Sequence, residues 1–306
     1  MVTIGNFDGV HRGHQVILEQ VRELGLKAGQ PTLLITFEPH PREFFSASNA
    51  PTRLTRFREK MRILARTSID RVLLLTFDER LSAMSPVEFI EDLLVAEVGA
   101  SAVVVGDDFR FGHRAEGNFE LLKASGERLG FEPLRHATFE VRGSRASSSR
   151  VRDALAEGDL ELAQALLGRP YSVLGRVAPG RQLGRTIGFP TANVALRRVA
   201  TPLSGVFAVR VRGLGDRGLS DEGLGDEPLP AMANLGTRPT VDGTQVLLEV
   251  NLFDFAQDIY GREISVEFVT KLRDEQKFDG LDALKAQLAR DGRAARAALG
   301  LEQSSD

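Results

Sequence analysis

The sequence predicts a doubly wound, Rossmann-like α/β domain followed by an antiparallel β-barrel domain with a C-terminal helix. In the first half, apolar runs that end at Gly5 or cover residues 32–37, 71–77 and 102–106 alternate with helical patterns, which is typical of a parallel sheet. Beyond Pro170, short strands of alternating polarity are separated by glycine-rich turns, which is typical of an antiparallel barrel or sandwich. The length of 306 residues favours two domains.

The remaining elements follow from local patterns in each half. We expect the runs at 32–37 and 71–77 to be buried parallel strands, because they are continuously apolar. The helical patterns of the first half begin at Gln15 and cover residues 56–65, 86–97 and 119–129. The strands of the second half are expected at 171–177, 205–212, 230–236, 245–253 and 264–272, with a helix at 281–298 and a long mobile loop at 213–230. A helical pattern after Ser147, Ser148 and Ser149 ends at Gly168, so we place one domain at 1–168 and the other at 169–306.

Composition excludes several classes of function. The net charge of −3 and the pI near 6.0 argue against a nucleic-acid partner, which usually requires a basic surface. With no cysteine, neither a disulfide framework nor a thiolate metal site can form. No apolar stretch is long enough for a signal or a membrane span, so we expect a cytoplasmic protein without a membrane partner. The sequence leaves a homo-oligomer open.

The first turn of the chain carries two histidines at the start of a helical pattern. His11 and His14 follow an apolar strand and a glycine-punctuated turn, where the carboxyl edge of a parallel sheet and a helix N-terminus favour an anion. Both rings could donate hydrogen bonds to a phosphate whose negative charge grows in a transition state. Two alternatives stay open at this point: polar residues that merely begin a helix, and a metal pair with Asp8.

The motif around these histidines resembles a known signature. FDGVHRGH is similar to the His-x-Gly-His motif of nucleotidyltransferases, and TIGNFDGVHRGHQ resembles the adenylyltransferase half of bacterial bifunctional riboflavin kinase/FAD synthetases. The resemblance implies an ATP site in which His11 and His14 face the α-phosphate as catalytic residues. It also implies that the preceding turn approaches the phosphates, through Gly5, Asn6, Phe7 and Asp8.

Three more segments of the first half resemble this family. TFEPHP resembles a stretch of the FMN pocket, which implies flavin contacts from Pro39, His40, Pro41 and Phe45. GDDFRFG follows an apolar strand and is implied to contribute Asp108 to the ATP site and Phe111 to the flavin site. RASSSRVR resembles the second nucleotide-binding signature, with Arg145, Ser148, Ser149 and Arg152 as ATP contacts. From the residues alone, a proline turn, a core phenylalanine and a helix N-cap remain alternatives for these three segments, and the N-cap is compatible with ATP binding.

The second half carries another glycine-rich motif, GRVAPGRQLGRTIGFPTAN. It is not a Walker loop, and glycines in a barrel are often simple corners. The motif nevertheless resembles the flavokinase signature, which implies ATP contacts from Gly180, Gly184 and Arg185. In that signature Thr191 and Asn193 hold both Mg²⁺ and the ATP phosphates.

A riboflavin kinase also needs a base for the 5′-hydroxyl of its substrate. Glu249 lies in LEVNLFDFAQDIYG, and the resemblance aligns it with the catalytic glutamate of the family. The non-functional alternative is that Glu249 is a solvated glutamate on an alternating strand. KLRDEQKF resembles the region that closes over the flavin, which makes Arg273 a flavin-contact candidate.

Together these motifs imply a two-site enzyme of FAD synthesis. One half would phosphorylate riboflavin to FMN, and the other would adenylylate FMN to FAD with release of pyrophosphate, with ATP as co-substrate and Mg²⁺ as the cofactor. A nucleotidyltransferase for a pantetheine or nicotinate nucleotide would not explain the GFPTAN half. A catalytically idle flavin or nucleotide sensor would not need the carboxylate of Glu249.

Overall fold

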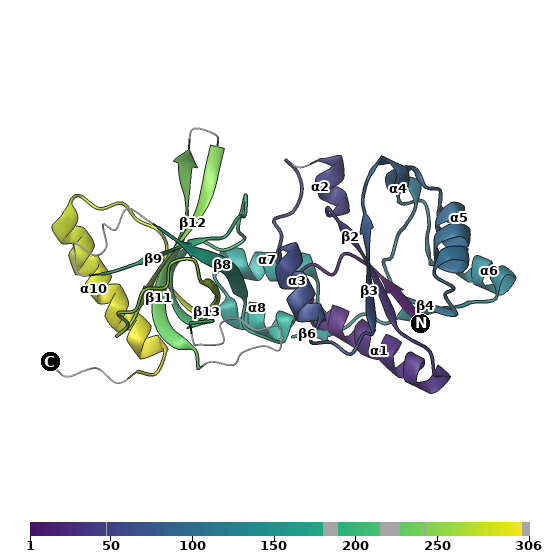
Figure 1. The fold of residues 1–306 in the computed structure, drawn as a ribbon, viewed down its shortest axis with the longest axis horizontal. Coiled ribbons are helices and arrows are strands. Elements are labelled where there is room, and N and C mark those ends of the chain that lie inside the picture. Colours follow the sequence, from purple (N-terminus) through teal and green to yellow (C-terminus); the bar gives the residue numbers. More distant parts are fainter. Residues whose placement is uncertain (47, 180–188, 215–226, 241–242, 302–306) are drawn as a thin grey trace. The chain divides into compact units, whose positions relative to one another are not determined.

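The computed structural model describes residues 1–46, 48–179, 189–214, 227–240 and 243–301 (Figure 1). Contacts divide the chain into two compact units. The first unit consists of Met1–Pro51 and Lys60–Ser148, and the second of Thr52–Glu59 and Ser149–Asp306. The domain boundary after Gly168 stays a prediction, and in this division that residue lies within the second unit.

A parallel sheet in the order β3-β2-β1-β4-β5 forms the centre of the first unit. Its strands are β1 (Val2–Ile4), β2 (Leu33–Glu38), β3 (Arg71–Thr76), β4 (Ala102–Gly106) and β5 (Glu132–His136). The short, wholly buried β1 lies in the middle, with β2 on one side and β4 on the other. The strand order reverses between β1 and β4, and in such sheets ligands bind beyond the carboxyl ends at this point. The turns after β1 and β4 therefore meet at one edge.

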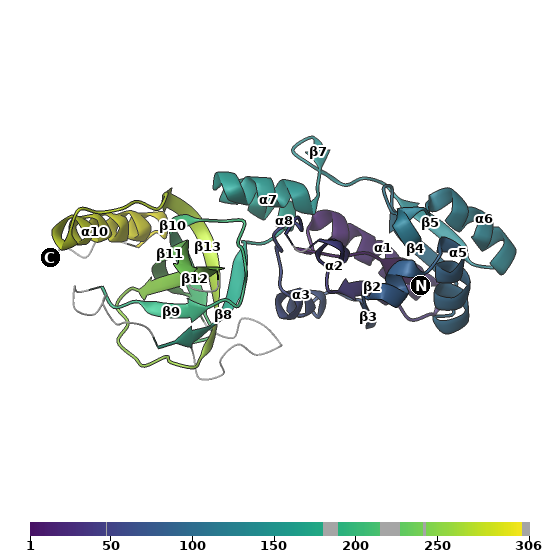
Figure 2. The same cartoon turned by 90° about the horizontal axis from the view of Figure 1, so that it is seen from above.

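Helices cover both faces of this sheet (Figure 2). On one face, Leu18 of α1 (Arg12–Ala28) and Leu64 of α3 (Phe57–Leu64) pack against Leu34. On the other, the π-helix η1 (Phe89–Glu97) and α6 (Phe119–Leu129) bury apolar residues against β1 and β4. The short elements of this unit are α2 (Pro41–Phe45), α4 (Glu79–Ala83), α5 (Pro86–Glu88), η2 (His113–Ala115) and the hairpin of β6 (Glu140–Val141) and β7 (Ser144–Arg145).

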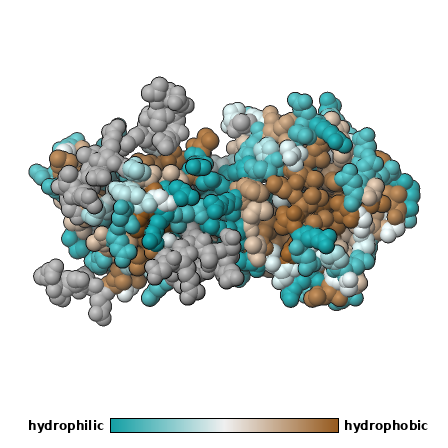
Figure 3. Space-filling view, in the orientation of Figure 1, coloured by the Kyte–Doolittle hydropathy of each residue, from teal (hydrophilic) through white to brown (hydrophobic). Residues whose placement is uncertain are grey.

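The expectation that residues 71–77 form a buried strand is wrong in one respect. The strand is parallel as predicted, but β3 is the edge of the sheet, and Val72 and Leu74 are 38% and 40% exposed. Apolar residues gather on the face of this unit that Figure 3 presents. An apolar run alone does not distinguish a central strand from an edge strand.

The helical pattern before Gly168 forms two helices instead of one. α7 (Ser148–Glu157) ends before Gly158, which has a φ of 79°. α8 (Leu160–Leu167) then begins after Asp159, whose side chain accepts a hydrogen bond from the backbone of Leu162. A left-handed glycine followed by an N-cap aspartate breaks the helix.

The second unit is built on a closed antiparallel barrel in the order β10-β11-β12-β9-β8-β13. Its strands are β8 (Ser172–Ala178), β9 (Ala192–Ala195), β10 (Gly205–Arg212), β11 (Leu229–Thr240), β12 (Gly243–Leu252) and β13 (Glu263–Arg273). The final helix, α10 (Leu281–Ala298), packs along β10, β11 and β13 (Figure 2). Its residues Ala295 and Leu299 share an apolar cluster with Met232. The predicted fold class is confirmed in both halves.

A segment from early in the sequence is part of the barrel unit. Glu59 forms a buried ion pair with Arg198, and the two side chains are 6% and 3% exposed. The carboxylate of Glu59 also accepts the backbone N–H of Leu174 at 2.8 Å. Arg198 in turn donates to the carbonyl oxygens of Arg53 and Leu54. These contacts tie residues 52–59 to the barrel.

Candidate active sites

The turn between β1 and α1 is tightly wound and mostly buried. Phe7 and Val10 have φ values of 50° and 42°, a region that side-chain-bearing residues rarely occupy. The N–H of Val10 donates to the carbonyl oxygen of Phe7, and the amide of Gln15 donates to that of Val10 at 2.8 Å. Strain of this kind persists where surrounding contacts impose it and is frequent at ligand sites.

The two histidines of the turn lie face to face at the start of α1. The ring centroids of His11 and His14 are 3.7 Å apart, and Phe7 lies 4.6 Å from His14. His11 caps the helix, since its Nδ1 accepts the backbone N–H of His14. A Cβ atom on Gly13 would lie 3.1 Å from the His11 ring, so this position favours glycine. The structure thus brings both predicted histidines to a helix N-terminus.

Burial controls the charge of His14. Desolvation lowers the pKa of His14 well below its usual 6.5, and the neighbouring His11 and the ammonium group of Lys60 lower it further. His14 is therefore neutral near pH 7. Its Nδ1 is buried and has no hydrogen-bond partner among the described residues, and the same holds for Oδ1 of Asn6. A neutral imidazole at a helix N-terminus can donate to a phosphate oxygen.

Other predicted ATP contacts lie around this turn or within the second unit. Ser148 donates from Oγ to the carbonyl oxygen of Asp8 at 2.9 Å, which joins the start of α7 to the turn. Gly5 adjoins the ring of Phe7, and a Cβ atom there would lie 3.0 Å from that ring. Ser149 and Arg152 belong to the second unit, where Nε of Arg152 donates to the carbonyl oxygen of Thr52.

Arg145 and Asp108, two of the predicted ATP contacts, lie together in the structure. Arg145 forms ion pairs with Asp107 at 3.0 Å and with Asp108 at 2.7 Å. Both carboxylates follow β4, at the same edge of the sheet as the turn after β1. A hydrogen bond from Thr138, aided by Arg145, lowers the pKa of Asp107. The sequence did not single out Asp107 or Thr138.

The predicted flavin contacts divide into an exposed and a buried group. His40 caps α2, which begins at Pro41 after a cis peptide bond between Glu38 and Pro39. Phe45 at the end of α2 is 67% exposed, and its ring meets Phe44 and Phe77 edge-on at 5.3 and 5.7 Å.

Phe111 belongs to the buried group. It packs in the apolar core between Phe89 and Phe109, with ring centroids 5.4 Å from each. The structure therefore places Phe111 in the core role that the sequence left open. Its assignment to the flavin stays a prediction.

In the barrel, strand register brings Glu249 beside Asn193. β12 pairs with β9 so that Glu249 lies opposite Asn193, and with β11 so that Glu249 also lies opposite Asn234. Directly opposed residues point to the same side of a sheet. The neighbouring Leu248 and Val250 are buried inside, so Glu249 and the two asparagines share the outer side. The sequence identified Glu249 and Asn193 separately; β9 brings them together.

Asn251 is a site residue that the sequence reasoning missed. Two residues beyond Glu249 on the same side of β12, it is buried and donates to the carbonyl oxygen of Pro190 at 2.7 Å. This bond holds the chain directly before Thr191, which is exposed. The signal available in the sequence was an asparagine two residues after a catalytic candidate on an alternating strand, and therefore on the same face.

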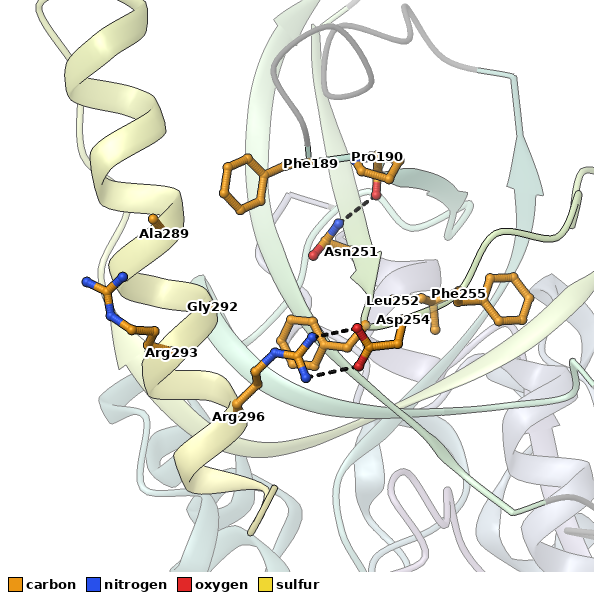
Figure 4. Close-up of a pocket in the computed structure, with 11 residues that line it drawn as sticks. Phe189, Pro190, Asn251, Leu252, Asp254, Phe255, Ala289, Gly292, Arg293 and Arg296 are labelled. Atoms are coloured by element: carbon orange, nitrogen blue, oxygen red, sulfur yellow. Dashed lines mark hydrogen bonds and ion pairs between the residues drawn. The ribbon is translucent and has the colours of Figure 1, made fainter. Parts of the chain in front are cut away.

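A pocket of about 400 Å³ opens next to this bond, between the end of β12 and α10 (Figure 4). Arg296 spans it from α10, with a bidentate ion pair to Asp254 at 2.9 and 3.0 Å and its guanidinium 4.5 Å from the Phe253 ring centre. This pair lowers the pKa of Asp254. The pocket is lined by Phe189, Pro190, Asn251, Leu252, Phe253, Asp254, Phe255, Ala289, Gly292, Arg293 and Arg296.

Arg273, the predicted flavin contact, makes an ion pair with the buried Asp291 of α10 at 2.7 Å. Gln287 donates to the same carboxylate, and the guanidinium lies 5.7 Å from the ring centre of Phe278. Arg273 thus ties β13 to α10, and its flavin contact stays a prediction. Gly180, Gly184 and Arg185 lie outside the described residues, as does most of the loop expected at 213–230.

No group of three or more His, Cys, Asp or Glu side chains in the described residues could hold a metal ion. No helix in the part of the chain that the structure describes is long and apolar enough to cross a membrane.

Comparison with known proteins assigns both units. Residues 1–150 match the family model of FAD synthetase, and residues 167–299 match that of riboflavin kinase. The bifunctional riboflavin kinase/FMN adenylyltransferase of Escherichia coli K12 is 50% identical over 301 residues, covering 98% of this chain and 93% of that protein. This chain belongs to the bifunctional riboflavin kinase/FMN adenylyltransferase family.

Another member of this family and one solved structure match this chain over nearly its full length. The Haemophilus influenzae enzyme of this family is 44% identical, and the match covers 97% of this chain and 93% of that protein. A crystal structure described as a macrolide-efflux protein from Streptococcus pneumoniae is 32% identical, with a TM-score of 0.81. The match covers 96% of this chain and 93% of the crystallised chain, so the two proteins share the two-unit fold. Both family models thus occur in this one chain.

Proposed function

We propose that this chain phosphorylates riboflavin to FMN in the barrel unit and transfers the adenylyl group of ATP to FMN in the α/β unit. The observation that carries the proposal is that each family match contains its own chemically equipped site. The turn with His11 and His14 lies in the first match, and the Asn193–Glu249 pair lies in the second. A nucleotidyltransferase for another small phosphate would leave the second site without a role.

In the kinase reaction, Glu249 accepts the proton of the riboflavin 5′-hydroxyl as that oxygen attacks the γ-phosphorus of ATP. The bond between the γ-phosphorus and the bridging oxygen breaks, and ADP leaves. Asn193 lies opposite Glu249, so the general base and a phosphate-binding residue are adjacent. The half-buried position of Glu249 on the outer side of the barrel leaves its carboxylate accessible to a substrate.

The donor set beside Glu249 fits Mg²⁺. The hydroxyl of Thr191 and the amide oxygen of Asn193 are hard oxygen donors, which Mg²⁺ prefers together with water and substrate phosphates. The nearby pocket offers space for the adenine ring and aromatic walls from Phe189, Phe253 and Phe255. When bound, Mg²⁺ would neutralise charge on the polyphosphate.

In the adenylyl transfer, a phosphate oxygen of FMN attacks the α-phosphorus of ATP, and pyrophosphate leaves. His11 and His14 donate hydrogen bonds to the α-phosphate oxygens, supported by the free N–H groups at the start of α1. The exposed ring of Phe45, with Phe44 and Phe77 beside it, offers an aromatic surface for the flavin. We also propose a cytoplasmic location.

The direct test incubates the purified chain with riboflavin and Mg-ATP and separates the flavins by chromatography. We expect FMN first and FAD second, and FAD alone when FMN is supplied. A chain that binds flavin and ATP but forms neither product would be a sensor, and conversion of a pantetheine or nicotinate nucleotide in place of FMN would contradict the proposal.

A further inference from the structure

Lys60 on α3 is buried, although it has no role in the family motifs described above. Its side chain is 6% exposed, whereas lysine is among the residues least often buried in proteins. Burying an ammonium group costs free energy unless hydrogen bonds and charges compensate it. A lysine in such a position therefore needs a specific explanation.

The ammonium group of Lys60 binds the turn that carries the two histidines. Nζ donates to the carbonyl oxygen of Asn6 and to Oγ1 of Thr36, both at 3.1 Å. Oγ1 of the wholly buried Thr36 also donates to the Asn6 carbonyl at 3.3 Å. Three segments, α3, β2 and the turn after β1, thus converge on one carbonyl group.

This carbonyl group is next to the strained part of the turn. Asn6 precedes Phe7, whose φ is 50° and whose ring packs against His14. A charge-assisted hydrogen bond is stronger than a neutral one and can hold a conformation that the backbone disfavours. Fixing Asn6 therefore fixes the packing of Phe7 against His14.

Lys60 also acts on His14 through its charge. The charged or titratable groups that act on His14 are His11, stacked on its ring, and Lys60 from α3. Both oppose the protonation of His14 and lower its pKa in addition to desolvation. Lys60 thus supplies a positive charge next to the turn, while His14 remains a neutral hydrogen-bond donor.

We propose that Lys60 is a positioning residue for adenylyl transfer, whose ammonium group holds the Asn6 carbonyl and thereby the turn that presents His11 and His14. This inference rests on the proposed function of that turn. It extends that function by one residue that touches neither reacting atom and acts through the backbone and through His14.

The test measures two quantities in the full chain: the rate of FAD formation from supplied FMN, and the pKa of His14 by NMR of its ring. In Lys60→Met, the rate should fall roughly 10- to 100-fold, and the pKa of His14 should rise toward 6.5 because a neighbouring cation is lost. In Lys60→Arg, which keeps the charge, the pKa should stay low. Lys27→Met, an exposed lysine of α1, is the matched control and should change neither quantity.

Further variants separate the possible failures. Lys60→Gln keeps a donor without a charge and serves if Lys60→Met does not fold; it should raise the pKa of His14 and preserve more of the rate. Riboflavin kinase activity, measured in every variant, monitors folding of the second unit. An unchanged rate or an unchanged His14 pKa in the neutral variants overturns the role of Lys60. If His14→Ala also forms FAD at the wild-type rate, the proposed adenylyl-transfer site itself is wrong.

Discussion

Replacing Arg198 with methionine should strongly destabilise the barrel unit. The variant would leave the buried carboxylate of Glu59 without its ion pair, and the carbonyl oxygens of Arg53 and Leu54 without one donor each. Breaking a buried pair from one side costs about 3–5 kcal/mol. Glu59 would keep the N–H of Leu174, so we expect about 4 kcal/mol, corresponding to a Tm lower by about 8–16 °C.

Differential scanning calorimetry measures this effect, with the barrel transition identified by its upward shift when riboflavin is added. The matched control is Arg128→Met, since its ion pair with Glu91 is exposed and should contribute under about 1 kcal/mol. The double variant of Arg198→Met with Glu59→Gln should recover part of the loss, because no unpaired charge remains buried. A Tm for Arg198→Met equal to that of the control would refute the assignment of residues 52–59 to the barrel.

Two further substitutions test the geometry of the two sites. Gly13→Ala would place a Cβ atom 3.1 Å from the His11 ring and 3.3 Å from the Ala146 carbonyl oxygen. We expect FAD formation from FMN to fall about 10-fold or more with normal riboflavin kinase rates; steady-state assays that find both rates normal would contradict the described packing. Asn251→Ala removes the hydrogen bond to Pro190, so the KM for ATP in the kinase reaction should rise about fivefold, the equivalent of roughly 1 kcal/mol. An unchanged KM for ATP would show that Asn251 does not contribute to nucleotide binding.

Much of the fold follows from local pattern. The strand at 205–212 and the helices at 119–129 and 281–298 have the bounds that their periodicity predicts, because each begins and ends at clear signals. β9 was missed because its four residues, which begin inside GFPTAN at Ala192, carry too little alternation to be recognised. The exposure of β3 was missed because position within a sheet depends on pairing between distant strands.

The candidate sites were predictable where a motif is continuous in the sequence. His11 and His14 are three residues apart, so their proximity follows from the turn itself. The pairing of Asn193 with Glu249 spans 56 positions (249 − 193) and depends on the register of β9 and β12. Nothing in the sequence pattern singles out Lys60, because a lysine in a helical pattern is ordinarily a solvated residue.

The central claim is that one chain carries two separate active sites, and two single variants test it most directly. Glu249→Gln should form no FMN from riboflavin yet convert supplied FMN to FAD at the wild-type rate. His14→Ala should form FMN from riboflavin and accumulate it, because adenylyl transfer is lost. Loss of both activities in either variant, or retention of the targeted activity, would contradict the account.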